Sequence, residues 1–97
     1  MSETKDRSEL CALLDRALAM TGERTARIPA GTVEAMLASI GNQLRFMRDT
    51  VAAGRAPTVA EKNSLTLGVI AVRELEATDP EYCDAITEAA FLFKKLA

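Results

Sequence analysis

Acidic side chains are concentrated in one short stretch, RELEATDPEY, which covers residues 73–82. It carries Glu74, Glu76, Asp79 and Glu81 directly after the apolar run LTLGVIAV. Two carboxylates held side by side are able to act as general acid and base. Residues two apart on a helix point in different directions, so Glu74 and Glu76 do not form such a pair. The stretch predicts a binding surface rather than a catalytic site.

Other catalytic patterns are absent from the sequence. The chain has no His, and it contains no Gly-rich phosphate loop, nucleophile elbow, HExxH or CxxC spacing. Cys11 and Cys83 lie far apart without a His partner, which excludes the usual zinc patterns and predicts buried free thiols in a reducing compartment. We therefore expect no enzyme activity, no cofactor and no metal.

Length and composition indicate one folded domain spanning residues 1–97. The chain is 48% hydrophobic and 27% charged, with a net charge of −2, so it lacks the basic excess of a nucleic-acid-binding domain. Its first ten residues, MSETKDRSEL, are polar, unlike a secretory signal or a membrane anchor. We expect a cytoplasmic protein that binds neither nucleic acid nor membrane, with residues 1–6 flexible.

Apolar residues recur at helical spacing in four segments. The first predicted helix starts at Asp6 and stops at the segment 28–31, the second runs from Gly31 or Thr32 to near Gly54, the third begins at Thr58, and the fourth begins at Pro80. The second helix has the clearest apolar stripe: Val33, Met36, Leu37, Ile40, Leu44, Met47 and Val51.

The third predicted helix is apolar on nearly every side between residues 65 and 72. LTLGV within it alternates like a short strand, but no other segment alternates to pair with it, so a helix is favoured. A helix of this kind belongs in the interior. The sequence therefore predicts an all-α fold, a compact four-helix antiparallel bundle with the third helix central.

The four acids of the opening stretch differ in how local structure explains them. Asp79 fits the N-cap of the fourth helix, with Glu81 in its first turn, where negative charge is favourable. Glu74 and Glu76 fall in the last turn of the third helix, where acids are mildly unfavourable. They either lie on a solvated face or present negative charge to a basic pocket of a partner.

Two aromatic residues fall outside the predicted core stripes. Phe46 lies opposite the stripe of the second helix, flanked by Arg45 and Arg48. It either packs against a second neighbour or forms an exposed contact of the composition found in interface hot spots. Phe91 lies beside Asp84, Glu88 and Lys95 and would serve a homodimer or the same partner.

Three strings give the chain a family resemblance: LDRALAM (14–20), QLRFMRDTV (43–51) and, most specifically, LTLGVIAVRELEATDPE (65–81). They resemble the immunity proteins of bacterial type VI secretion that neutralise an NAD(P)+ glycohydrolase effector. The resemblance implies an all-α cytoplasmic protein that binds a cognate toxin domain and occludes its active site. The chain departs from the family in its first connection, TGERTARIPAGTVEA, and in its charged N-terminal extension.

The resemblance turns the acidic stretch into a hypothesis about toxin binding. A pocket that holds a dinucleotide pyrophosphate offers donors or positive charge, and carboxylates are able to take the place of phosphates there. The candidate toxin-binding residues are Glu74, Glu76, Asp79, Glu81, Arg45, Phe46 and Arg48. The alternative is a small helical adaptor that self-associates without a toxin partner.

Overall fold

The computed structural model describes residues 3–27 and 32–96. Its helices are α1 (Glu3–Arg27), α2 (Thr32–Ala52), α3 (Val59–Ser64), α4 (Leu67–Leu75) and α5 (Pro80–Lys94). No residue of the two described ranges lies in a strand. The predicted all-α class is confirmed.

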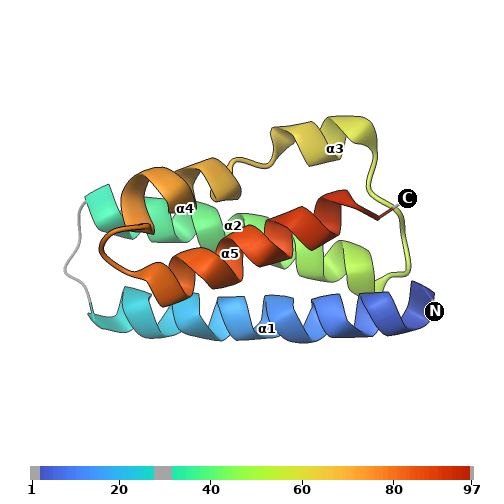
Figure 1. Cartoon of the computed structure of the whole chain (residues 1–97), viewed down its shortest axis with the longest axis horizontal. Coiled ribbons are helices and arrows are strands. Elements are labelled where there is room, and N and C mark those ends of the chain that lie inside the picture. The colour runs from blue at the N-terminus through green and yellow to red at the C-terminus, as the bar shows by residue number, and fades with distance from the viewer. Residues whose placement is uncertain (1–2, 28–31, 97) are drawn as a thin grey trace.

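The helices lie around one core, with α1, α3 and α4 running in one direction and α2 and α5 in the opposite direction (Figure 1). α1 packs antiparallel to α2 and to α5, and α4 packs antiparallel to α5. The largest fully buried side chains come from four of the five helices: Leu10, Leu14, Ile40, Leu44, Met47, Leu67, Ile86, Tyr82 and Phe93. The apolar stripes predicted for α1, α2 and α5 thus supply most of the core.

One helix boundary and one core stripe differ in detail from the prediction. α1 begins at Glu3, ahead of the expected start at Asp6. The flexibility predicted for residues 1–6 stays a prediction, and the cap predicted at Gly31 lies outside the described residues. Val33 was expected in the core stripe of α2 but is 51% exposed, because in the first turn of the helix it lines an open hollow instead of the packed core.

The third predicted helix is divided into α3 and α4. α3 begins with the predicted capping box: Thr58 Oγ1 accepts from the Glu61 amide at 3.1 Å, and Glu61 Oε1 accepts from the Thr58 amide at 2.9 Å. Arg55 also binds this carboxylate, and chiefly for that reason the pKa of Glu61 is lowered to about 2. The backbone then becomes extended at Leu65, which ends α3.

A side chain from another helix starts α4. Gln43 Oε1 of α2 accepts hydrogen bonds from the amides of Thr66 at 2.7 Å and Leu67 at 3.0 Å. Its Nε2 donates to Thr66 Oγ1 at 3.1 Å. The Thr66 side chain itself makes no capping hydrogen bond. Gln43 therefore supplies the acceptor that the first amides of a helix require.

The prediction that the third helix is central is wrong. α4 turns Leu67, Ala71 and Leu75 toward the core but leaves Val69 59% and Val72 51% exposed. α4 lies at the edge of the bundle, where it packs mainly against α5 (Figure 1). α4 is thus a short helix that carries apolar residues on its exposed face as well as on its buried face.

A polar cluster joins α1 to the start of α5. Arg24 Nε donates to Asp79 Oδ2 at 2.6 Å and Nη2 donates to Oδ1 at 3.1 Å, while the guanidinium lies 4.7 Å from the centre of the Tyr82 ring. The Tyr82 hydroxyl is hydrogen-bonded to Thr21 Oγ1. Since Thr21 gives its only hydroxyl hydrogen to the Ala17 carbonyl, Tyr82 is the donor. The cluster satisfies a fully buried phenol and fixes where α5 begins.

The interhelical cap on α4 gives a stability prediction. Gln43→Ala leaves the amides of Thr66 and Leu67 without their acceptor, so we expect the free energy of unfolding to fall by about 1–2 kcal/mol. Gln43→Glu keeps the acceptor and places negative charge at a helix N-terminus, so we expect it to stay within about 0.5 kcal/mol of wild type. Urea unfolding of both variants measures the difference. Equal losses in the two variants would contradict the capping role.

The pair between Arg24 and Asp79 gives a pH prediction. The Arg24 hydrogen bond lowers the pKa of Asp79 in the folded protein, so the contribution to stability is present above the ordinary carboxyl pKa and is lost as the pH falls through the lowered value. We expect Asp79→Asn to cost about 1–2 kcal/mol at pH 7 and progressively less below about pH 4.

Urea unfolding at several pH values checks this expectation. Glu81→Gln is the matched control, because Glu81 is exposed and its carboxylate lies 3.7 Å from Arg16, which is exposed as well. It should leave stability nearly unchanged at every pH. A deficit of Asp79→Asn that does not shrink in acid would rule out the ion pair as its source.

Candidate functional site

The four predicted acids lie at the α4–α5 turn but have different surroundings. Glu74 and Glu76 are exposed at the end of α4, and within residues 3–27 and 32–96 neither forms an ion pair. Glu81 is exposed in the first turn of α5, and its carboxylate makes a long contact of 3.7 Å to Arg16. Asp79 is held by Arg24. Glu74 and Glu76 are thus the carboxylates of this turn most available to a partner.

The role predicted for Asp79 needs a correction. It occupies the N-cap position of α5 with Pro80 next to it, as expected, but its side chain makes no capping hydrogen bond. The carboxylate turns to Arg24 of α1 instead. Local sequence located the residue correctly, while the partner that holds its side chain is distant in the sequence.

The second predicted group, on α2, is largely occupied by internal contacts. The half-buried Phe46 packs edge-on against Phe93, with ring centres 6.3 Å apart, so it contacts a second neighbour as one of the two alternatives expected. Arg48 Nε donates to Asp15 Oδ1 at 2.6 Å and ties α2 to α1. Arg45 is exposed and binds Asn42 on its own helix. None of the described contacts joins these side chains to the α4–α5 turn.

A hollow between α2 and α4 was not foreseen. It has a volume of about 430 Å³ and is lined by Val33, Ala35, Met36, Ile70 and Glu74; we call it the α2–α4 groove. The signal was present in the sequence, because apolar residues continue to the very start of α2. They were assigned to the core because periodicity shows which residues share a face but not how much of that face a neighbour covers.

The groove continues toward the α4–α5 turn. A second hollow of about 210 Å³ shares Val33 and Met36 with it and extends to Leu75, Thr78 and Asp79. The apolar wall of the groove therefore leads to the turn that carries Glu76.

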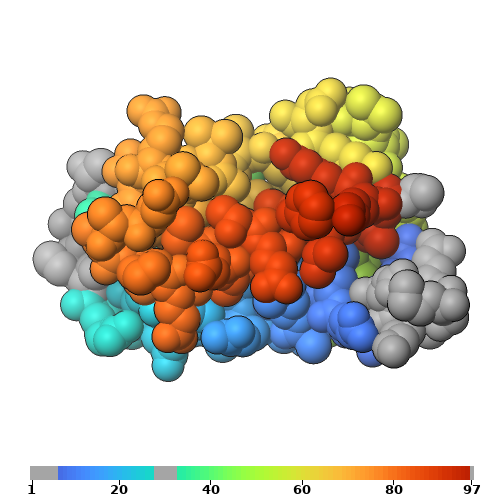
Figure 2. Space-filling view, in the orientation of Figure 1, coloured from blue at the N-terminus to red at the C-terminus, as the bar shows by residue number. Residues whose placement is uncertain are grey.

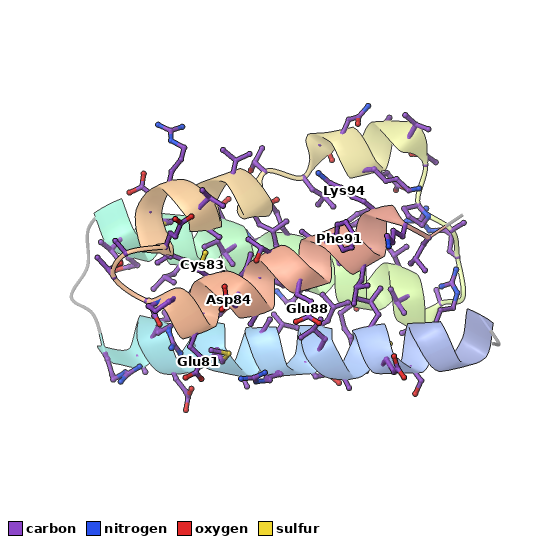
Figure 3. All side chains as sticks on the ribbon, viewed as in Figure 1. Glu81, Cys83, Asp84, Glu88, Phe91 and Lys94 are labelled. Atoms are coloured by element: carbon purple, nitrogen blue, oxygen red, sulfur yellow. The ribbon has the colours of Figure 1, made fainter. Side chains whose placement is uncertain are left out.

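The outer face of α5 is a separate exposed surface. Glu81, Asp84, Glu88 and Phe91 follow one another along it (Figure 3). α5 crosses the visible face of the molecule between α4 and α1 (Figure 2). Phe91 is 59% exposed, and Lys95 Nζ lies 4.4 Å from the centre of its ring. The prediction that Phe91 lies outside the core stripe is confirmed.

The acidic and cysteine side chains of the described residues form no metal-binding arrangement. No group of three or more His, Cys, Asp or Glu in them is placed to hold a metal ion. Cys11 is half-buried and Cys83 is buried, and both are free thiols. Burial raises the pKa of Cys83, which keeps it as an unreactive thiol. Among the described helices, none has the length and hydropathy to cross a membrane. The α2–α4 groove and the α4–α5 turn offer a partner apolar contact area and negative charge.

The chain is similar to characterised proteins over most of its length. The sequence profile of the Tsi6 family matches residues 9–95. The immune protein Tsi6 of Pseudomonas aeruginosa is 39% identical over 79 residues, which make up 81% of this chain and 80% of that protein.

Solved structures give the same relation. The structure of Tsi6 from Pseudomonas aeruginosa superposes with a TM-score of 0.75 at 34% identity, covering 87% of this chain and 93% of the other. A structure of Tse6 in complex with Tsi6 matches with a TM-score of 0.76 at 33% identity, covering 88% and 86%. The family resemblance found in the sequence is confirmed, and this chain belongs to the Tsi6 family of immune proteins.

Proposed function

We propose that this chain is an immunity protein that binds a toxin related to Tse6 in the cytoplasm and neutralises it by covering its active site. The observation that carries the proposal is the family relation to Tsi6, whose structure is known in complex with Tse6. The chain acts by binding, not by catalysis. The exposed carboxylates and apolar groove of the described surface suit that role, since interfaces combine apolar pockets with charged surroundings.

The chemistry of the toxin forms a second part of the proposal. We propose that the toxin is a type VI secretion effector that hydrolyses NAD(P)+. Its pocket must then hold a pyrophosphate with donors or positive charge, and a carboxylate-bearing turn is complementary to it. Of the predicted contact residues, Glu74 and Glu76 fit best because both are exposed and unpaired among the described residues. Arg45, Phe46 and Arg48 remain a proposed second contact.

Self-association is the second candidate function. It is favoured by the exposed Phe91, which a symmetric contact between two α5 helices would bury. Light scattering of the pure protein distinguishes the two functions. A dimer that does not bind toxin supports the adaptor, whereas a chain that binds toxin at one-to-one stoichiometry supports the immunity protein.

The role of the turn is tested by reversing its charge. We expect Glu74→Lys/Glu76→Lys to weaken binding of the cognate toxin domain at least tenfold, about 1.4 kcal/mol, because two attractive contacts become repulsive. Isothermal titration calorimetry measures the affinity. Glu9→Lys/Asp49→Lys is the matched control, since it makes the same change in net charge at exposed acids outside the turn.

The outcome separates the function from the site. If the double variant binds as tightly as wild type, the turn does not belong to the interface, although the immunity role stands. If wild type itself neither binds the toxin nor restores growth to cells that express it, the immunity role is wrong.

A further inference from the structure

We propose that the α2–α4 groove is the anchor site for the toxin: it receives an apolar side chain of the toxin, and Glu74 binds a Lys or Arg next to that side chain. This inference rests on the proposed function and names the part of the surface that carries it out. It adds Val33, Met36 and Ile70 to the contact residues.

The groove exposes apolar side chains of two helices. Val33 is half exposed, and Met36 and Ile70 are only partly buried against the core. These side chains come from two helices and form the two walls of one hollow. Its volume of about 430 Å³ falls within the range of about 300–1,000 Å³ that is typical of ligand pockets. The strongest contacts of protein interfaces are anchors that fill pockets of this kind.

The charge at the groove specifies a cationic neighbour for the anchor. Glu74 lines the groove, and no cation among residues 3–27 and 32–96 pairs with it. Arg73 is its neighbour in sequence, but adjacent residues on a helix do not face each other. The acid at the far end of the hollow, Asp79, is already neutralised by Arg24. A Lys or Arg of the partner therefore finds its complementary charge at Glu74.

The groove is also continuous with the turn that the family resemblance singled out. The adjoining hollow leads past Val33 and Met36 to Thr78 and Asp79, so one bound segment is able to contact the groove and the α4–α5 turn together. The outer face of α5 offers a less suitable anchor site. Phe91 is 59% exposed on that face, and its ring is already covered on one side by Lys95.

Val33→Asp tests the anchor, because it places a charge in the apolar wall. Val59→Asp is the matched control: Val59 is 73% exposed, lies outside the groove and, like Val33, stands in the first turn of its helix. Aspartate is favourable in a first turn, so both variants should fold. With the toxin domain related to Tse6 from the same organism, we expect calorimetry to show at least tenfold weaker binding for Val33→Asp and unchanged binding for Val59→Asp.

Glu74→Gln tests the cation. Because charge pairs are screened by salt, we expect the affinity of wild type to fall as salt rises and that of Glu74→Gln to fall less steeply.

The groove proposal is wrong if wild type binds the toxin domain and Val33→Asp binds it with the same affinity. It is also wrong if Phe91→Ala alone loses affinity tenfold, because the interface would then lie on α5. If wild type itself does not bind the toxin domain, both the groove proposal and the proposed function are wrong. This outcome differs from a failure of the groove proposal alone, in which wild type still binds. Urea midpoints of all variants show whether a loss of affinity comes from unfolding. If Val33→Asp is unfolded, the more conservative Val33→Ser takes its place.

Discussion

The burial of Tyr82 is the constraint on which the arrangement of the helices depends. Its ring is fully buried at the start of α5, and its hydroxyl is satisfied only because Thr21 of α1 accepts the hydrogen bond. Arg24, from the next turn of α1, covers the ring and binds Asp79. An unsatisfied buried phenol would cost about 1–3 kcal/mol, so α1 and α5 are held in one relative position. The α4–α5 turn is fixed with them.

The position of α4 follows from that turn at one end and from Gln43 at the other. α4 is short, and a single face of it is buried against the bundle. Its other residues line the groove with α2 or face outward. In a protein whose family acts by binding, such a helix edge provides contact area without weakening the core.

The sequence predicted local features well and the contacts between distant residues poorly. In α5, the apolar residues that recur at helical spacing are buried: Tyr82, Ile86, Ala89, Ala90 and Phe93. The capping box at Thr58 also forms as its spacing predicts. The break before α4 was missed because its cap comes from Gln43, which is distant in sequence. Asp79 was placed at a helix start, but its pairing with Arg24 depends on how α1 meets α5.

In the candidate site, too, local features were predicted and contacts between distant residues were not. Glu74 and Glu76 were identified because acids at the end of a helix are locally unfavourable, and the structure leaves them exposed. The groove beside Glu74 was not identified, because Val33 fits the spacing of the core stripe of α2 although half of its side chain stays exposed. Phe46 shows the opposite case: it lies outside the core stripe of α2, yet its ring packs against Phe93.

Amide hydrogen exchange of the chain, measured with and without the toxin domain, tests the central claim most directly. If the toxin binds at the α2–α4 groove, exchange slows in α4, at the α4–α5 turn and in the first turns of α2, while α3 and the second half of α5 keep their free rates. Protection confined to α5 around Phe91, with α4 unchanged, would contradict the account.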